Sequence, residues 1–414
     1  MVARVLPRRM AWLVAIVATL TMTVSYADRL TLSVLAPVIT KELDISEEAY
    51  GWLGSAFSMA YLLGTPFAGW WIDRAGARRG LVASVFAWSA VAALHALVPG
   101  FWVLFALRLA LGVTEGPGFP GAAQTVQRIL PPHDRERGFG LLFTGSSFGA
   151  MVIPPFATLI FRHAGWRIAL LGTAAAGLVW IPLWIAVTRS QAVRAQLDVA
   201  TVAPAATSED RPAVRELLAH PIVIRALCGV FAAAPIFSFA QVWGAKYLVR
   251  TFALAQGDVG HYLWLPPIVF DAGAILFGDL ASRQHRPEGA PPRALFAIGL
   301  ALATLLAALP LAQTPWQSMF IIGVAMAGGG ALYTLVTSDL LARMPPGSVS
   351  LAGGILAGAQ SLALIIANPL IGRVLDRLGS YDAIGIGLAV WAMPGSLIWL
   401  CWRPPVRFVP RRPR

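Results

Sequence analysis

The sequence predicts an all-α polytopic membrane protein with about twelve transmembrane helices in two six-helix halves that repeat one another. Hydrophobic residues make up 57% of the 414 residues and charged residues only 13%, and the mean hydropathy of +0.69 is far above that of an average soluble domain. A helix crosses a hydrocarbon core with about 20 residues, so a chain of this length holds about twelve spans and their loops. The alternating short strands of a membrane β-barrel are absent from the sequence.

Clusters of charged residues, prolines and glycines separate the apolar runs and place the expected spans. We expect spans near residues 11–39, 50–72, 80–98, 101–130, 138–161, 166–188, 221–249, 257–280, 293–311, 316–342, 350–375 and 383–402. The first run has no small-residue cleavage site and is too long for a cleaved signal peptide, so it is expected to remain as a span.

One long polar interruption divides the chain into halves. The predicted organisation is an N-terminal six-helix half over residues 1–188, a cytoplasmic linker over 189–219, a C-terminal six-helix half over 220–402 and a basic cytoplasmic tail over 403–414. Landmarks recur at equal spacing, since Pro155 and Pro369 lie 214 residues apart, as do Gly165 and Gly379. Repeated halves are typical of secondary transporters, whose substrate site lies between the halves near the middle of the membrane.

Basic residues collect in alternating short loops. The net charge of +12 would favour nucleic acid binding in a soluble protein, but the positive-inside rule explains these arginines better. The sequence therefore predicts a lipid bilayer as partner and no nucleic acid, with both termini cytoplasmic in a plasma membrane, the inner membrane of a bacterium. Two basic segments, Arg162 to Arg167 and Arg373 to Arg377, fall on the opposite side and are exceptions.

Four charged residues lie deep inside apolar runs: Asp28 and Arg29 in the first, Arg108 and Glu115 in the fourth. Charge at that depth is costly and is usually kept for a partner, a substrate or a proton. Arg108 and Glu115 are seven residues apart and share one helix face. The four charges sum to zero when all are ionised, which makes their burial tolerable.

These four residues have the chemistry of proton-coupled anion binding. Burial favours the protonated form of a carboxyl group and a nearby arginine favours the ionised form, so Asp28 and Glu115 are candidate proton carriers. An arginine released from its carboxylate offers a planar fork that matches a substrate carboxylate, which makes Arg29 and Arg108 candidate anion ligands. The alternative is a neutral network that only joins spans one and four.

The loop between spans two and three carries Gly69, Asp73, Arg74, Gly76 and Arg78. Here Gly69 would permit close helix approach, Asp73 could accept hydrogen bonds from a neighbouring helix N-terminus or an arginine, and Gly76 would allow a tight turn. The segment resembles the signature of the major facilitator superfamily and predicts a cytoplasmic gating turn. A plain basic loop is the alternative interpretation.

A closer resemblance extends over nearly the whole chain. It rests on Tyr26, Asp28, Arg29, Ser33, Ala36, Pro37, Arg108, Glu115, Pro117, Phe119, Pro120, Trp243, Lys246, Tyr247, Trp264, Pro266, Asp271, Gly273, Tyr333, Thr334, Ser338, Asp339, Gly379, Ser380 and Tyr381. Together these motifs resemble the anion:cation symporter family, which includes carriers of hexuronates, galactonate and glucarate and the sialin-type carriers. The resemblance implies the major facilitator fold, proton-carrying acids at Asp28 and Glu115, and arginines at Arg29 and Arg108 that partner these acids or the substrate.

Further polar residues lie on spans that line the cavity in this fold. Tyr26 and Tyr61 could hydrogen-bond sugar hydroxyls, or they could only pack. Lys246 could contact the anion or extend to the membrane interface. The remaining candidates for substrate binding are Gln241 and Gln360, on spans seven and eleven.

Two acidic residues of the second half, Asp271 and Asp339, lie on expected spans. Asp271 is either functional or pairs helices, and the sequence does not separate the two. Asp339 and Arg343 are four residues apart at a span end, which predicts a structural ion pair.

The function predicted from these residues is the proton-coupled symport of an organic anion, a sugar acid such as a hexuronate or aldonate, by alternating access. Protons are the coupling ion, no other cofactor or metal is expected, and the chain is expected to act as a monomer. No nucleotide-binding loop occurs in the sequence, and neither a metal motif nor a nucleophile with its base indicates an enzyme. A proton-coupled exporter of drugs or metabolites is the first alternative, and a transporter-like sensor is the second.

Overall fold

The structure is a computed structural model that describes residues 6–198, 214–284, 291–345, 348–406 and 408. Residues 199–213 of the predicted linker and residues 407 and 409–414 of the predicted tail lie outside the described residues. The described part is helical, with no strand. Its elements are α1 (Arg8–Glu42), α2 (Glu47–Ala75), α3 (Ala77–Leu94), η1 (His95–Leu97), α4 (Phe101–Glu115), α5 (Gly118–Ile129), α6 (Pro132–Val187), α7 (Gln191–Leu197), α8 (Val214–Leu218), α9 (Pro221–Ser238), η3 (Phe239–Trp243), α10 (Gly244–Phe252), η4 (Gln256–Asp258), α11 (Gly260–Leu263), α12 (Leu265–Arg283), α13 (Arg293–Thr304), η5 (Leu305–Leu311), α14 (Pro315–Arg343), α15 (Val349–Leu378) and α16 (Asp382–Cys401).

The described helices account for twelve spans, as predicted. Nine stretches are long and apolar enough to cross a membrane. One of them, α6, is two spans joined at Gly165, whose backbone (φ 78°, ψ 174°) interrupts the helix. The helix α2 and the α4–α5 pair, which are not among the nine, supply the remaining two.

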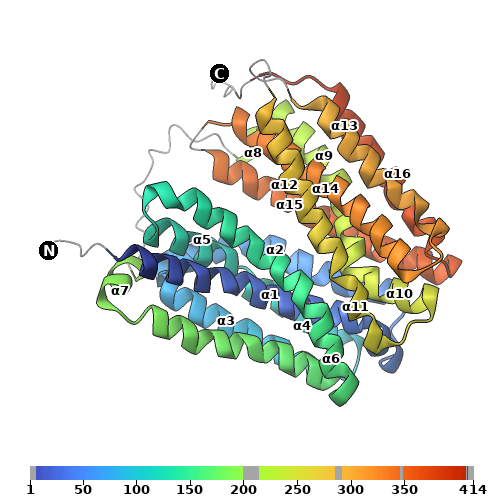
Figure 1. Ribbon diagram of the computed structural model, residues 1–414, viewed down its shortest axis with the longest axis horizontal. Coiled ribbons are helices and arrows are strands. Elements are labelled where there is room, and N and C mark those ends of the chain that lie inside the picture. Colours follow the sequence, from blue (N-terminus) through green and yellow to red (C-terminus); the bar gives the residue numbers. More distant parts are fainter. Residues whose placement is uncertain (1–5, 199–213, 285–290, 346–347, 407, 409–414) are drawn as a thin grey trace. The chain divides into compact units, whose positions relative to one another are not determined.

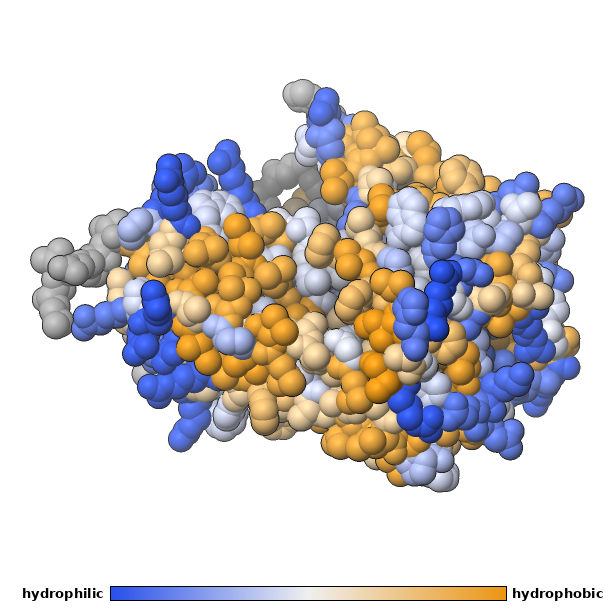
Figure 2. Space-filling model, turned by 60° about the horizontal axis from the view of Figure 1, so that its bottom comes forward, coloured by the Kyte–Doolittle hydropathy of each residue, from blue (hydrophilic) through white to orange (hydrophobic). Residues whose placement is uncertain are grey.

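Large apolar side chains lie on the outside of the helices, as a bilayer requires. Leu63, Phe67, Trp102, Ile275 and Leu311 are among those that are mostly exposed. On the face shown in Figure 2, apolar residues cover broad areas, and hydrophilic residues gather at the left end and over parts of the right half. An exposed apolar surface of this extent is expected of a protein that lies in lipid.

The helices form two compact units. Unit 1 holds residues 1–202 together with 244–264, and unit 2 holds residues 203–243 together with 265–414. In unit 1, α1 packs along α6 and α2 packs along α4. In unit 2, α14 packs against α9, α12 and α13, and α9 also packs against α15 and α16 (Figure 1).

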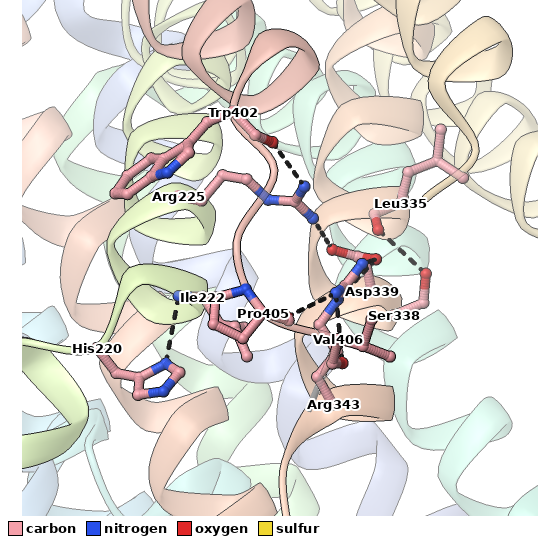
Figure 3. Close-up of polar contacts among 10 residues, drawn as sticks. All are labelled: His220, Ile222, Arg225, Leu335, Ser338, Asp339, Arg343, Trp402, Pro405 and Val406. Atoms are coloured by element: carbon pink, nitrogen blue, oxygen red, sulfur yellow. Dashed lines mark hydrogen bonds and ion pairs between the residues drawn. The ribbon is translucent and has the colours of Figure 1, made fainter. Parts of the chain in front are cut away.

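A buried charge cluster in unit 2 holds the segment that directly follows α16 (Figure 3). The predicted ion pair is confirmed, because Arg343 Nη2 lies 2.8 Å from Asp339 Oδ1. Arg225 of α9 also donates to Asp339 and to the main-chain oxygen of Trp402, the latter at 3.2 Å. Arg343 Nη1 donates to the oxygen of Pro405 at 3.1 Å. These bonds leave the buried charges compensated, which is the condition under which buried ions are tolerated.

The arginines of one of the two predicted exceptions are ion-paired. Arg167 Nη1 lies 2.5 Å from Glu42 Oε1, and Arg162 is ion-paired with Asp258. The charge of both arginines is therefore compensated by acidic neighbours of the same unit.

Candidate functional site

The centre of the candidate site is an ion pair between two helices of unit 1. Arg29 Nε of α1 donates to Glu115 Oε2, at the last residue of α4, over 2.5 Å. The Ser25 hydroxyl donates to the same carboxylate oxygen at 2.7 Å. Ser25 lies one helical turn before Arg29 and so shares its face. The sequence analysis missed this serine, although its spacing from Arg29 could have revealed it.

The other two buried charges have no such partner. Asp28 and Arg108 are 5% and 6% exposed, and both carboxylate oxygens of Asp28 are buried with no hydrogen-bond partner, as are Nε and Nη1 of Arg108. Of the four buried charges, the structure pairs only Arg29 with Glu115 by a direct ion pair. Asp28 and Arg29 are neighbours on α1 and point about 100° apart, which is why one meets Glu115 and the other does not.

A row of aromatic rings on α2 supports both arginines. The guanidinium carbon of Arg29 lies 4.5 Å from the centre of the Phe57 ring and 5.1 Å from that of Tyr61. The guanidinium carbon of Arg108 lies 5.1 Å from the same Phe57 ring. Tyr26 adds a third ring near Arg29, at 5.3 Å. Ring faces attract cations, so these rings hold the arginines while leaving guanidinium N–H groups for other acceptors.

The aromatic row follows from sequence spacing. Phe57 and Tyr61 are four residues apart, and Tyr50 precedes Phe57 by seven, so the three rings share one face of α2. Sequence analysis selected Tyr61 for its hydroxyl and missed Phe57, which contacts both arginines. A phenylalanine in an apolar helix carries no signal of this role until its neighbours are known.

Lys246 lies in unit 1 with the C-terminal end of α1 and the start of α2. Its Nζ is 2.8 Å from Glu47 Oε2 and donates to the Thr40 hydroxyl at 2.8 Å. The ring of Tyr50 lies 4.8 Å from the same nitrogen. A cavity of about 350 Å³ opens here, and its lining includes Thr40, Glu47, Lys246 and Arg250. The lysine is thus ion-paired and buried and does not extend freely to the interface.

Gln241 and Gln360 belong to unit 2. Gln241 lies in the π-helix η3 and Gln360 in α15, and both are partly buried. Whether these amides face the same substrate as Arg29 and Arg108 of unit 1 stays a prediction.

The predicted gating turn adopts the expected backbone at one glycine. Gly76 ends α2 with φ 76°, and its N–H bonds to the oxygen of Ile72. A Cβ at Gly76 would lie 2.8 Å from the main-chain oxygen of Leu197. Around Gly69 nothing would lie within 4 Å of an added Cβ, so close helix approach does not explain this glycine in the structure. Arg74 is exposed and lies against the ring of Trp70.

Two charged residues of the turn have partners elsewhere in unit 1. Asp73 accepts a hydrogen bond from Gln124 Nε2 of α5 at 2.8 Å, instead of from a helix N-terminus or an arginine. Arg78 Nε lies 3.0 and 3.1 Å from the two carboxylate oxygens of Asp198, just after α7. The start of the predicted linker is therefore bound to the turn.

Comparison with known proteins decides the family. The sequence profile of the Major Facilitator Superfamily matches residues 16–355. The chain belongs to the Major Facilitator Superfamily. As a member it is a membrane transporter and not an enzyme. Among the described residues no group of three or more His, Cys, Asp or Glu side chains could hold a metal ion.

Within the superfamily the chain is similar to several sugar-acid carriers. The D-galactonate transporter of Escherichia coli O6:H1 is 25% identical over 343 residues, which cover 78% of this chain and 80% of that protein. A probable galactarate/D-glucarate transporter of Bacillus subtilis is 23% identical over 77% of this chain and 76% of its own length. The hexuronate transporter of Escherichia coli K12 is 24% identical over 65% of this chain and 64% of its own length.

A solved structure shows the same fold. It is a bacterial homologue of the human lysosomal transporter Spinster, in an inward-facing and unoccupied conformation. The match has a TM-score of 0.78 and covers 95% of this chain and 97% of the other, with 18% sequence identity. The superfamily fold predicted from the sequence is therefore confirmed.

Proposed function

We propose that this transporter carries an organic anion, a sugar acid such as a hexuronate or aldonate, together with protons in symport. We place it in the plasma membrane, the inner membrane of a bacterium, as a monomer with both termini cytoplasmic. The names of its relatives, which carry galactonate, galactarate, glucarate and hexuronates, support the substrate class.

The observation that carries the proposal is the unpaired Arg108. Its Nε and Nη1 are buried with no acceptor, and a buried guanidinium without an acceptor is costly. A substrate carboxylate would supply an acceptor for these buried N–H groups in a charge-assisted hydrogen bond. Arg29 also contacts the aromatic rings of α2. If Glu115 released Arg29, the Arg29 guanidinium would become a second ligand of the anion.

Coupling to protons follows from the carboxyl groups beside these arginines. When Glu115 takes a proton, its attraction for Arg29 falls and the guanidinium becomes free for an anion. When an anion binds, the added negative charge favours the protonated form of Glu115 and of Asp28. Proton and anion therefore promote each other's binding, and this mutual preference is the thermodynamic requirement for symport.

The test is the variant Glu115→Gln in proteoliposomes. The amide cannot take up the coupling proton, so accumulation of labelled sugar acid driven by an inward proton gradient should be lost, while exchange of labelled for unlabelled substrate should continue. Glu136→Gln, at an exposed position of α6, is the matched control and should leave both activities unchanged. Gradient-driven accumulation at the wild-type level in Glu115→Gln would overturn the assignment of Glu115.

A further inference from the structure

Span seven is not a continuous α-helix. The helix α9 ends at Ser238, a π-helical turn (η3) covers Phe239–Trp243, and α10 begins at Gly244. The chain also passes from unit 2 to unit 1 at Gly244. A π-helical turn inside a span is uncommon and is often found at functional sites. A specific contact should therefore stabilise the π-helical turn of span seven.

A single side chain bridges the two ends of the π-helical turn. Asn368 of α15, the only asparagine in the sequence, accepts a hydrogen bond through Oδ1 from the Ser238 hydroxyl at 2.8 Å and from Trp243 Nε1 at 3.2 Å. All three residues are at most 1% exposed. Because an indole nitrogen only donates, the amide oxygen must face Trp243, and the direction of both bonds follows.

The spacing of the two donors makes this bridge selective for the π form. Ser238 and Trp243 are five residues apart. In an α-helix of 3.6 residues per turn, side chains five apart point about 140° away from each other, so they could not both reach one oxygen. In a π-helix, whose hydrogen bonds join residues i and i+5, they lie about one turn apart on the same face.

The hydrogen bonds of Asn368 show which of its side-chain atoms stabilises the structure. Its Nδ2 is buried with no hydrogen-bond partner, a cost that a leucine of similar size would not carry. The two bonds accepted by Oδ1 are therefore the favourable contribution of the residue. We infer that Asn368 is a positioning residue that holds span seven in its π-helical form and so sets the orientation of Gln241 within the turn and of Lys246 after it.

Loss of the bridge has a geometric consequence for Lys246. A π-helical turn contains one residue more than an α-helical turn, so relaxation to a regular α-helix would rotate the following residues by about 100° around the span axis. Lys246 is three residues beyond Trp243 and would lose its contacts with Glu47 and Thr40. Its amine would then leave a buried ion pair.

The sequence offers an internally controlled measurement of this change, because Lys41 and Lys246 are the only two lysines. Lys41 is exposed and Lys246 is buried. Brief acetylation of the full-length protein in detergent, followed by mass spectrometry, gives the labelling of Lys246 relative to Lys41. In the wild type we expect this ratio to be low. In Asn368→Leu we expect it to rise about tenfold, the factor that corresponds to the loss of one or two net hydrogen bonds.

Two serine variants, Ser238→Ala and Ser396→Ala, allow the test to be made even if Asn368→Leu does not fold. Ser238→Ala removes one donor of the bridge and should raise the ratio about threefold, less than Asn368→Leu because one bond remains. Ser396→Ala is the control, since Ser396 is equally buried but its hydroxyl has no hydrogen-bond partner, and it should leave the ratio unchanged. An unchanged ratio in both Asn368→Leu and Ser238→Ala, or an equal rise in Ser396→Ala, would overturn the inference.

The part of the inference that concerns Gln241 rests on the proposed transport function. The labelling of Lys246 does not depend on that function. If Asn368 positions Gln241, then Asn368→Leu raises KM for the sugar acid, and adding Gln241→Ala to that variant has little further effect. Additive effects of the two substitutions would contradict the positioning role. Absence of sugar-acid transport in the wild type would remove the proposed function while leaving the labelling result to judge the π-helical bridge.

Discussion

At the scale of single residues, the two carboxyl groups of the site differ in what surrounds them. Glu115 has an arginine and a serine hydroxyl on one oxygen, whereas Asp28 has no hydrogen-bond partner on either oxygen. The two acids therefore differ in what a substitution removes: at Glu115 it removes bonds to Arg29 and Ser25, and at Asp28 it removes no hydrogen bond.

This difference predicts opposite effects on stability. Asp28→Asn should leave the free energy of unfolding unchanged or raise it by up to about 1 kcal/mol, because no partner is lost. Glu115→Gln should lower it by about 2 kcal/mol, less than for a fully buried pair because Arg29 keeps some solvent contact and its aromatic neighbours. Thermal unfolding in detergent measures both. A loss of stability in Asp28→Asn as large as that in Glu115→Gln would show that Asp28 has a structural partner.

Arg29→Lys tests the need for a planar fork. A lysine keeps the positive charge but donates from one point, so one charge-assisted hydrogen bond to the substrate carboxylate is lost. We expect KM for the sugar acid to rise about tenfold or more, the factor that corresponds to such a bond. Arg137→Lys, at an exposed position of α6, provides the comparison and should not change KM. Unchanged kinetics in Arg29→Lys would exclude Arg29 from the site.

At the scale of elements, the turn between α2 and α3 shows which parts of a motif have a local physical cause. Gly76 has a left-handed backbone and is packed against the main chain after α7, so both conformation and space require glycine. Gly69 is helical with free space around it. Of the two glycines in the motif, only Gly76 therefore meets a local structural requirement.

Replacing each of the two glycines by alanine tests this difference between them. Gly76→Ala should destabilise the protein by about 2 kcal/mol, because a Cβ strains the backbone and meets the oxygen of Leu197. Gly69→Ala should be neutral or stabilise by up to about 1 kcal/mol, because alanine favours a helix. Thermal unfolding of the two variants is the measurement, and equal stability of the two would contradict the account of the turn.

The sequence predicted the number of spans but not the breaks within them. Span length and apolar composition predicted twelve spans, because lipid imposes both. The breaks inside span four at Gly116 and Pro117, and inside span seven at η3, were not predicted. The second break depends on Asn368, more than a hundred residues away along the chain, so no local pattern around Ser238 could reveal it. The same limit applies to Phe57, whose role depends on two arginines of other helices.

At the scale of the whole molecule, the repeat of six-helix halves and the superfamily match agree on the fold, while the contacts assign residues 244–264 to unit 1. Lys246 therefore lies in the same unit as Arg29 and Arg108, although it follows the predicted linker in sequence. Its neighbours Glu47 and Thr40 belong to segments that sequence analysis had no reason to join to span seven. The sequence reveals the four buried charges, because placing ions in lipid is costly. It does not reveal that Arg29 pairs with Glu115 and not with Asp28.

If a sugar acid and protons move together through this transporter, the movement of protons can be measured directly. Proteoliposomes of the wild-type protein, with a pH-sensitive dye outside and no initial pH difference, receive an inward gradient of galactonate or a hexuronate, with valinomycin and potassium to balance charge. Symport predicts alkalinisation of the outer medium that begins with the addition of substrate and is absent in Glu115→Gln. Uptake of labelled substrate without any change in external pH would contradict the account.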